Sequence, residues 1–165
     1  MAREYVISSG GITLANAAVT LVFINPKTTG PASTIEIVRC WVGQSANATS
    51  AQQRVQLVTQ VTAFPTLTSF TPKKTKIGDP ASEITGGTAG AAGTCGINAS
   101  AEGAGAKTII WEDAFNVLNG WLWMPQEIER IQLRVGELSG FGFHFPVAAA
   151  TLTNWAFGLV YREIG

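Results

Sequence analysis

Apolar and polar residues alternate with a period of two along most of the chain, and the clearest case lies near the C-terminus. The apolar positions there are Trp155, Phe157, Leu159 and Tyr161. Successive side chains of a β-strand point to opposite faces, so this pattern predicts a strand with one buried face. The same alternation predicts further strands at residues 19–23, 55–61 and 131–135.

One predicted strand changes phase within its length. Its apolar residues Ile35 and Ile37 share one phase, whereas Cys40 and Val42 share the other. Two arrangements explain the change: a β-bulge near Arg39, which inserts one extra residue, or burial of both faces of the strand. Both arrangements keep this segment in a β-sheet.

Helical patterns are weak by comparison. Pro125 followed by Glu127 predicts a short helical turn, because proline is favoured at the first helical position and acidic residues are favoured near a helix N-terminus. Residues 45–53 are long enough for a second turn. About eight strands joined by irregular loops favour an all-β fold, a jelly-roll-like antiparallel β-sandwich, as a single domain over residues 1–165.

A long Gly/Ala-rich segment interrupts the strand pattern. Thirteen of the twenty residues from Gly86 to Gly105 are glycine or alanine. Connections of this length inside a compact domain are uncommon, and they are either functional or disordered. Small residues allow a backbone to lie close to another surface. We therefore expect an extended loop over residues 72–107 that docks on a neighbouring protein, with a disordered surface loop as the alternative.

The chain carries few charges, and they balance. Lysine plus arginine and aspartate plus glutamate number 11 each, and charged residues make up 13% of the chain, about half the usual ~25%. Nucleic-acid binding requires clustered basic residues, so we expect no nucleic-acid partner. A protein without net charge has little electrostatic repulsion between copies. Few charges and five tryptophans favour a protein that works inside an assembly.

Targeting signals and cysteine usage are consistent with synthesis in the cytoplasm. The N-terminal residues do not follow the pattern of a secretory signal. No apolar run approaches the roughly 18 residues that span a bilayer, so we expect no membrane association. Cys40 and Cys95 lie far apart in different contexts. Two such cysteines predict free thiols in a reducing compartment rather than a disulfide or a metal site.

The sequence contains no recognisable catalytic motif. The single histidine, His144, lies in a predicted strand whose phenylalanines share the opposite face, which indicates a packed or solvent-facing histidine. No G-x-S-x-G nucleophile motif is present. Residues 101–108 resemble the end of a phosphate loop, but Ala101 and Ala106 stand where its two glycines are required.

The acidic residues show no catalytic arrangement either. Glu112 and Asp113 are adjacent, so a strand points them to opposite faces and prevents them from acting together as glycosidase carboxylates. Glu127 and Glu129 are spaced as on an exposed strand or turn. One histidine and scattered acids supply no metal-ligand set. We expect no enzymatic activity, no cofactor and no bound metal.

Three tryptophans allow two interpretations. Trp121 and Trp123 share one face of a predicted strand, and Trp111 lies in a preceding segment. They form either a sugar-stacking platform, as in a lectin-like sandwich, or part of the core or of a subunit interface. Alternation alone favours the core or the interface, because a core pair has the same spacing.

Six segments, taken in order, carry a resemblance to a known family. They are residues 32–42, 53–57, 71–74, 78–82, 91–105 and 154–164. In this order they resemble the small jelly-roll proteins encoded in the structural gene blocks of tailed bacteriophages, which act as capsid decoration (cement) proteins. The similarity covers most of the chain from about Ala18 onward, and its motifs are structural rather than catalytic.

The resemblance implies a homotrimer that sits on the outside of an assembled phage capsid, at three-fold or quasi-three-fold positions, and stabilises the shell. Its partners are then the major capsid protein and its own copies, and its location is the exterior of the virion. Residues 1–9 are the expected N-terminal arm, and residues 72–107 are the expected docking loop. The candidate capsid or subunit contacts are Arg3, Glu4, Tyr5, Lys73, Lys74, Asp79, Ile97 and Asn98.

Two other functions remain open at this point. The first is a carbohydrate- or receptor-binding jelly roll of a phage tail fibre or spike, which exposed tryptophan near Asp and Asn at one loop end favours. The second is a small β-sandwich hydrolase, which a carboxylate and a nucleophile within hydrogen-bond reach of His144 favour. Trimers joined by apolar contacts that involve the Gly/Ala-rich loop favour the decoration role.

Overall fold

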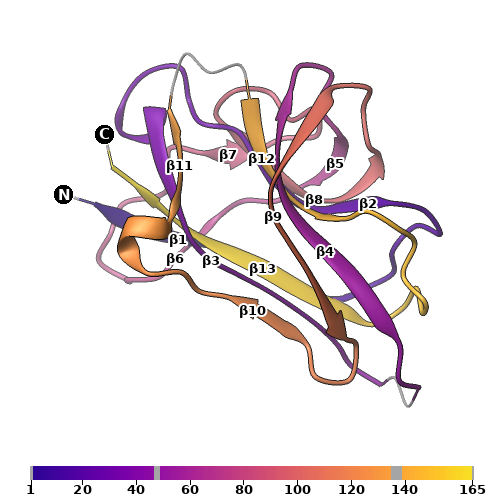
Figure 1. The fold of residues 1–165 in the computed structure, drawn as a ribbon. Helices are drawn as coiled ribbons and strands as arrows, with labels where there is room; N and C mark the ends of the chain where they lie inside the picture. Colours follow the sequence, from indigo (N-terminus) through magenta and orange to yellow (C-terminus); the bar gives the residue numbers. More distant parts are fainter. Residues whose placement is uncertain (1, 47–48, 135–138, 165) are drawn as a thin grey trace.

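The computed structural model describes residues 2–46, 49–134 and 139–164, which fold as two β-sheets packed face to face (Figure 1). Sheet A contains β1 (Arg3–Ile12), β3 (Thr34–Gln44), β6 (Lys73–Lys74), β10 (Trp121–Trp123), β11 (Ile131–Arg134) and β13 (Trp155–Glu163). Sheet B contains β2 (Val19–Ile24), β4 (Gln52–Val61), β5 (Thr66–Ser69), β7 (Thr85–Gly86), β8 (Thr94–Ala101), β9 (Ala106–Asn116) and β12 (Ser139–Phe145). The prediction of an all-β sandwich is confirmed.

The strand pairing is that of a jelly roll. The first strand β1 pairs with the last strand β13 in sheet A, and β2 pairs with β12 in sheet B. Next, β3 pairs with β10 and β11 in sheet A, and β4 pairs with β9 in sheet B. Strands from the first half of the chain thus pair with strands from the second half, and successive pairs belong alternately to sheet A and sheet B. A jelly roll has this pattern, which corresponds to a long hairpin rolled up into two Greek keys.

The core lies between the inner faces of the two sheets. The predicted alternation in β13 is confirmed, because all four of its large apolar side chains are buried. Trp155 packs edge-on against Phe145, with ring centroids 5.1 Å apart, and its Nε1 donates to the carbonyl of Thr151 at 2.8 Å. This aromatic contact joins sheet A to sheet B, because Trp155 belongs to β13 and Phe145 to β12.

The phase change in β3 corresponds to a β-bulge. Arg39 pairs with Val160, and Ile37 pairs with Tyr161, so Val38 is the extra residue. The bulge lies one position from the predicted one. It lets both Ile37 and Cys40 point into the core although they are an odd number of residues apart.

A cover over sheet B explains why every residue of β2 is buried. The β4–β5 connection lies over the outer face of sheet B, where the Phe64 ring lies 5.5 Å from the Phe23 ring. A side chain at Gly140 would collide with Phe23, since an added Cβ would lie only 2.5 Å from the Cε1 atom of that ring. Glycine in β12 therefore makes room for this second layer of aromatic packing.

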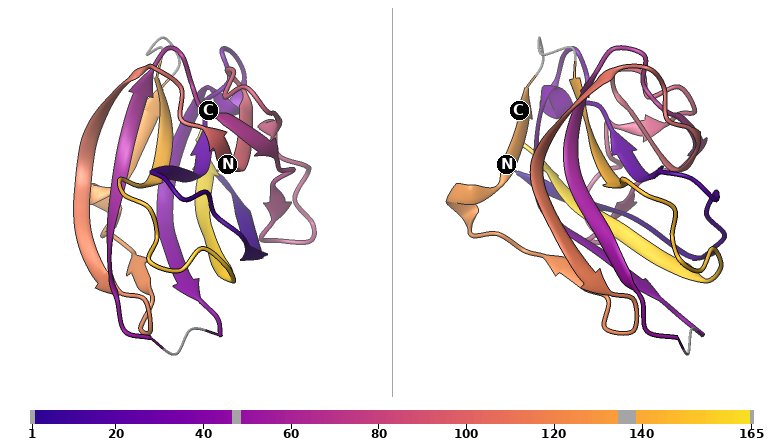
Figure 2. Two further views of the ribbon diagram at one scale, coloured as in Figure 1. Left: turned by 90° about the vertical axis from the view of Figure 1, so that its right-hand side faces the viewer. Right: turned by 45° about the vertical axis from the view of Figure 1, so that its right-hand side comes forward.

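The segment 72–107 differs from the extended loop that the sequence predicts. It contains the short strands β6 and β7 and the whole of β8, which pairs with β2 and β5 in sheet B. The small residues serve close packing inside the chain: a side chain at Gly96 would lie 2.8 Å from the backbone oxygens of Gly87 and Thr68. The connection from β6 to β7 is the longest irregular stretch among the described residues, and it projects on the side away from β9 (Figure 2, left).

The expected N-terminal arm lies mostly in the fold. Residues from Arg3 onward belong to β1, which pairs with β13 from Arg3–Glu163 to Ser9–Phe157 without a break. Backbone pairing and two inward-facing apolar side chains account for this, since the alternation of the segment matches a half-buried strand. Met1 lies outside the described residues.

Helical structure is confined to two 3-10 turns among the described residues, η1 (Pro31–Ser33) and η2 (Glu127–Glu129). The helical turn predicted near Pro125 corresponds to η2. The described part of residues 45–53 contains no helix, and β4 begins at Gln52; residues 47–48 lie outside the described part. No described helix has the length and apolar character needed to cross a bilayer.

Candidate functional site

One side of the sandwich exposes large apolar side chains where the edge strands β9 and β10 lie next to each other. Their exposed fractions range from 43% to 66%, and the residues are Ile109, Ile110, Trp111, Leu122 and Met124. Most of β9 is exposed, because it is the last strand of sheet B and has a partner on one side only. Exposed apolar residues on an edge strand are typical of a surface that another protein covers.

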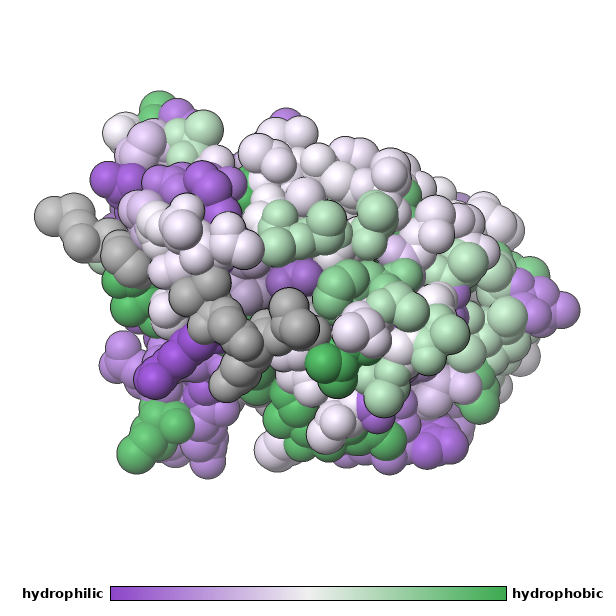
Figure 3. Space-filling view, turned by 90° about the horizontal axis from the view of Figure 1, so that it is seen from above, coloured by the Kyte–Doolittle hydropathy of each residue, from purple (hydrophilic) through white to green (hydrophobic). Residues whose placement is uncertain are grey.

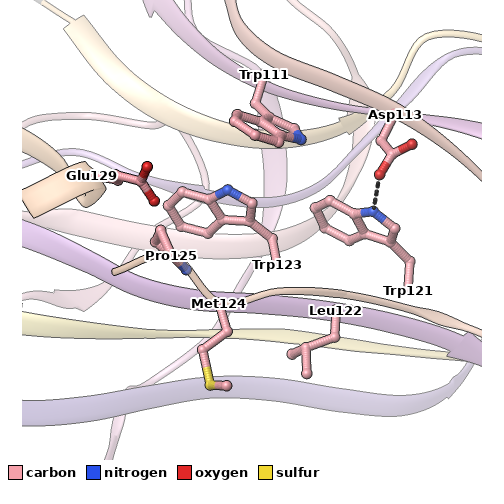
Figure 4. Close-up of a pocket in the computed structure, with 8 residues that line it drawn as sticks. All are labelled: Trp111, Asp113, Trp121, Leu122, Trp123, Met124, Pro125 and Glu129. Carbon is pink, nitrogen blue, oxygen red and sulfur yellow. Dashed lines mark hydrogen bonds between the residues drawn. The ribbon is translucent and has the colours of Figure 1, made fainter. Parts of the chain in front are cut away.

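A cleft of about 250 Å³ opens between these two strands (Figure 4). Trp111 comes from β9, whereas Trp121 and Trp123 come from β10 and face it across the cleft. Trp121 also packs on Phe143 of the core, with ring centroids 5.6 Å apart. Leu122, between Trp121 and Trp123 in the strand, lines both this cleft and the hollow on the outer face of sheet A. We call this feature the tryptophan cleft.

Two carboxylates give the tryptophan cleft a negative character. Asp113 accepts a hydrogen bond from Trp121 Nε1 at 3.0 Å, and its other oxygen accepts one from the backbone nitrogen of Ala114 at 2.7 Å. Glu129 lies beside the ring of Trp123 (Figure 4). The residues that line the cleft include no lysine or arginine. Aromatic faces and carboxylates together suit a cationic group or a ligand with hydroxyl donors.

The outer face of sheet A continues this apolar surface. The Trp41 ring covers Gly158, where an added Cβ would come within 2.8 Å of the Cη2 atom of the ring. A shallow hollow beside Trp41 is lined by Gly43, Leu122 and Ala156. Arg39 stacks over the Trp41 ring, with its guanidinium carbon 5.7 Å from the ring centroid. The surface from this sheet face to the tryptophan cleft is therefore largely apolar.

The surface seen from above is mostly of intermediate hydropathy (Figure 3). Strongly hydrophilic residues gather mainly toward the two ends of that view. This distribution follows from the low share of charged residues in the sequence, 13%. Burying an unpaired charge costs free energy. Another protein can therefore contact much of this face without that cost.

A buried polar cluster lies elsewhere, on the outer face of sheet B. Glu102 accepts hydrogen bonds from the backbone nitrogen of Thr20 at 2.6 Å, from the Thr20 hydroxyl at 2.7 Å and from Lys107 Nζ at 2.5 Å. His144 Nδ1 lies 3.3 Å from the same carboxylate and 3.3 Å from the Thr20 hydroxyl. Burial raises the pKa of Glu102, but the bonds from His144, Lys107 and Thr20 outweigh it and lower the pKa to about 2.

This cluster contains the residue types of a hydrolytic triad in a different geometry. In a triad the histidine contacts the acid through one ring nitrogen and the nucleophile through the other. Here both Thr20 and Glu102 contact Nδ1 of His144, and Thr20 and His144 are buried. The cluster instead ties the β8–β9 connection, which contains Glu102, to β2 and β12. The absence of enzymatic activity stays a prediction.

Two of the eight predicted contact residues are buried within the chain itself. Tyr5 is fully buried in β1, and Ile97 is only 5% exposed in β8. Both assignments are corrected, because each residue faces inward from a strand in a segment that the sequence predicts as an arm or a loop. A buried side chain is not available to a partner in this fold.

The other predicted contacts are partly exposed and fall into two places. Pairing of β1 with β6 brings four of them to one edge of sheet A: Arg3, Glu4, Lys73 and Lys74. Asp79 follows in the β6–β7 connection, and Asn98 lies in sheet B, where its Nδ2 donates to the carbonyl of Thr13 at 3.3 Å. The structure therefore groups five of the six at one edge.

Residues outside the predicted set are more exposed. Ile77 is 99% exposed in the β6–β7 connection, and Ile128 is 91% exposed in η2. The exposure of both isoleucines could have been predicted from the sequence. Each has charged or small neighbours and lies in a segment without apolar alternation. Single exposed apolar residues are common on protein surfaces, so neither isoleucine marks a contact without a second feature beside it.

The described residues contain no group of three His, Cys, Asp or Glu side chains that could hold a metal ion. Cys40 and Cys95 are free and buried. Comparisons of the chain with protein-family models, with curated proteins and with solved structures found no match.

Proposed function

We propose that this chain is a structural virion protein of the decoration type, which binds the outside of an assembled phage capsid as a homotrimer and stabilises the shell. The observation that carries the proposal is the continuous apolar surface from the outer face of sheet A to the tryptophan cleft. A surface of this kind supports a role in binding other protein, since it loses contact with water when a partner covers it.

The homotrimer part is supported by surface chemistry. Leu122, 58% exposed, lines the hollow at Trp41, and Met124, 66% exposed, follows directly after β10 and lines the tryptophan cleft. Aromatic residues and methionine are enriched in the buried centres of protein interfaces, and charged residues are depleted there. A charge-poor chain with zero net charge also has little repulsion between copies.

The capsid part is supported by the resemblance of the six sequence segments to decoration proteins. A decoration protein binds the assembled lattice and not its separate subunits. Many identical contacts of this kind then favour the assembled state by mass action. Three linked copies also gain avidity, because the second and third contacts form at high effective concentration.

Co-sedimentation with assembled capsids of the phage that carries the gene tests this function. We expect the wild-type chain to pellet with intact capsids and to stay in solution with unassembled capsid protein. Leu122→Ser/Met124→Ser should reduce both trimer formation and capsid binding, because it removes apolar contact area. Val147→Ser is the matched control, since Val147 is 45% exposed in the β12–β13 connection. No pelleting of the wild-type chain with capsids contradicts the proposal.

Deletion of residues 1–9 is not a suitable test. These residues include most of β1, whose pairing with β13 forms the centre of sheet A. Its removal would expose the core partners of inward-facing Tyr5 and Ile7 and unfold the chain rather than remove one contact. Point substitutions at exposed positions separate binding from folding.

Carbohydrate binding is the second candidate, and one observation favours it. Trp111 is 51% exposed in a cleft that also contains Asp113 and Glu129. A sugar ring stacks on such an indole, and carboxylates accept hydrogen bonds from its hydroxyl groups. Titration with a panel of saccharides, followed by tryptophan fluorescence, tests this role. Saturable quenching that is lost in Trp111→Ala supports it, and a flat response across the panel contradicts it.

A further inference from the structure

The β6–β7 connection presents a basic turn with an exposed apolar tip. The backbone nitrogen of Asp79 donates to the carbonyl of Lys76 at 3.2 Å, which closes a turn with Ile77 at its corner. Both the backbone nitrogen and the hydroxyl of Thr75 donate to the carbonyl of Glu4, at 3.3 Å and 2.9 Å, and fix the base of the turn to β1. We call residues 73–79 the lysine turn.

The side chains of the lysine turn point into solvent. Ile77 is 99% exposed, and the three lysines around it, Lys73, Lys74 and Lys76, are exposed as well. None of these lysines forms an ion pair with another described residue. A fixed turn with one apolar residue among unpaired cations has the features of an anchor for a negatively charged apolar cleft.

The tryptophan cleft is complementary to this anchor in shape and charge. Its volume of about 250 Å³ lies just below the range of small-ligand pockets, roughly 300–1,000 Å³, so it suits one or two inserted side chains. Its aromatic faces suit the aliphatic side chain of Ile77. Asp113 and Glu129 are two carboxylates with no lysine or arginine in the lining, so an ammonium group beside them gains a charge partner.

The two features lie at opposite edges of sheet A. The strand order β10-β3-β13-β1-β6 separates them by four strand spacings, roughly 19 Å. The lysine turn of one chain is fixed to β1 and therefore cannot fill the cleft of the same chain. A contact between the turn and a cleft joins two copies through different surfaces, head to tail, and such contacts produce a ring when the rotation closes.

We infer that the lysine turn of one copy inserts into the tryptophan cleft of the next copy, with Ile77 against the indoles and Lys76 beside Glu129. Three such contacts close the homotrimer, so this inference rests on the proposed function. The occupant of the cleft is then a second copy of this chain. A free saccharide is the competing occupant, and saccharide binding to the intact trimer detects it.

A charge-exchange cycle on the full chain tests the contact. The variants are Lys76→Glu, Glu129→Lys and the combination of both, and sedimentation velocity measures the fraction of trimer over a range of concentrations. Each single variant brings like charges together, so the concentration at half-assembly should rise about tenfold or more. The combined variant should recover most of the loss, because the charges are then exchanged and not removed.

Ile77→Ser tests the apolar part of the contact, with Val147→Ser as the matched control in a different connection. We expect Ile77→Ser to weaken the trimer and Val147→Ser to leave it unchanged. The substituted side chains are all exposed, and thermal unfolding checks that each variant folds. The tryptophan emission should shift to longer wavelength in the dissociated variants, because Trp111 becomes more exposed to water.

Two failures are distinguishable. A wild-type chain that is monomeric at all concentrations contradicts the proposed homotrimer itself. A wild-type trimer that is unchanged by Lys76→Glu and Ile77→Ser contradicts only this contact, and it assigns the trimer to another surface. Saccharide binding in the cleft of an intact trimer also overturns the inference, because the cleft cannot hold both occupants.

Discussion

Asp113 on β9 and Trp121 on β10 are joined by a hydrogen bond of 3.0 Å from the indole nitrogen to the carboxylate. The two strands belong to different sheets, β9 to sheet B and β10 to sheet A. The bond therefore closes the sandwich at an edge where backbone pairing between the strands is absent among the described residues. It also holds Trp121 in the cleft that we assign to subunit contact.

Replacing Asp113 tests this link. We expect Asp113→Ala to lower the free energy of unfolding by about 1 kcal/mol, since a charge-assisted hydrogen bond is lost at a partly exposed position. Glu112→Ala is the matched control on the same strand, because Glu112 points to the opposite face and pairs with Arg54 on the surface. Exposed pairs of this type contribute little, so the control should change stability by less than about 0.5 kcal/mol. Urea unfolding measures both values, and equal effects contradict the assignment.

The Glu102 cluster predicts a dependence of stability on acid. The pKa of Glu102 is lowered from 4.5 to about 2 in the folded chain, so folding favours its charged form. This stabilisation, on the order of 3 kcal/mol, is fully present above about pH 4.5 and is lost as the pH falls toward 2. Glu102→Gln should therefore be less stable than the wild type at pH 7, and the difference should shrink between pH 4.5 and 2.

Urea unfolding at a series of pH values from 7 to 2 measures that difference. Glu127→Gln is the control, since the Glu127 side chain is 77% exposed and its ion pairs with Arg130 and Arg162, at 3.8 Å and 3.5 Å, are surface pairs that contribute little. Its difference from the wild type should stay near zero throughout. A gap between Glu102→Gln and the wild type that does not change with pH contradicts the role of the ionised carboxylate.

Gly158 predicts a steric effect at the centre of sheet A. A Cβ at this position would lie 2.8 Å from Cη2 of the Trp41 ring and 2.5 Å from the backbone oxygen of Ile7, and the oxygen cannot move without disturbing β1. We expect Gly158→Ala to destabilise the chain by roughly 1–3 kcal/mol. Gly43→Ala, on the same sheet, should be neutral or slightly stabilising, because a Cβ added there would meet no atom within 4 Å. Thermal unfolding of the pair distinguishes crowding from a general effect of alanine.

The two cysteines predict a slow reaction with thiol reagents. Burial raises the pKa of the Cys95 thiol to about 12 and raises that of Cys40 well above its ordinary value. The thiolate is the reactive form, so both residues should resist a disulfide reagent such as DTNB in the folded chain. Two thiols per chain should react after unfolding in guanidinium. Rapid reaction of either thiol in the folded state contradicts the burial.

The alternation of residues was sufficient to predict most of the sandwich. Trp155 and its neighbours in β13 show why: sheet strands with one buried face have period two, and the sequence contains that signal directly. The bulge in β3 could also be predicted from the change of apolar phase, because one inserted residue moves Cys40 to the same face as Ile37.

Other features depend on contacts between distant segments. β8 could not be predicted because its glycine and alanine residues give no apolar period, and they are small since β5 and β7 both lie close along the edge of β8 that faces away from β2. The burial of Tyr5 depends on pairing with a strand more than 150 residues away. The tryptophan cleft required the rolled topology, which brings Trp111 of one sheet opposite Trp121 of the other.

The most direct test of the proposed assembly is the molar mass of the purified wild-type chain in solution. Size-exclusion chromatography with light scattering measures this mass without assumptions about shape. Three chains of 17.4 kDa, in a peak that keeps its mass on dilution, are the predicted result. A single 17.4 kDa species at every concentration would contradict the homotrimer and leave its apolar surface without the partner we assign to it.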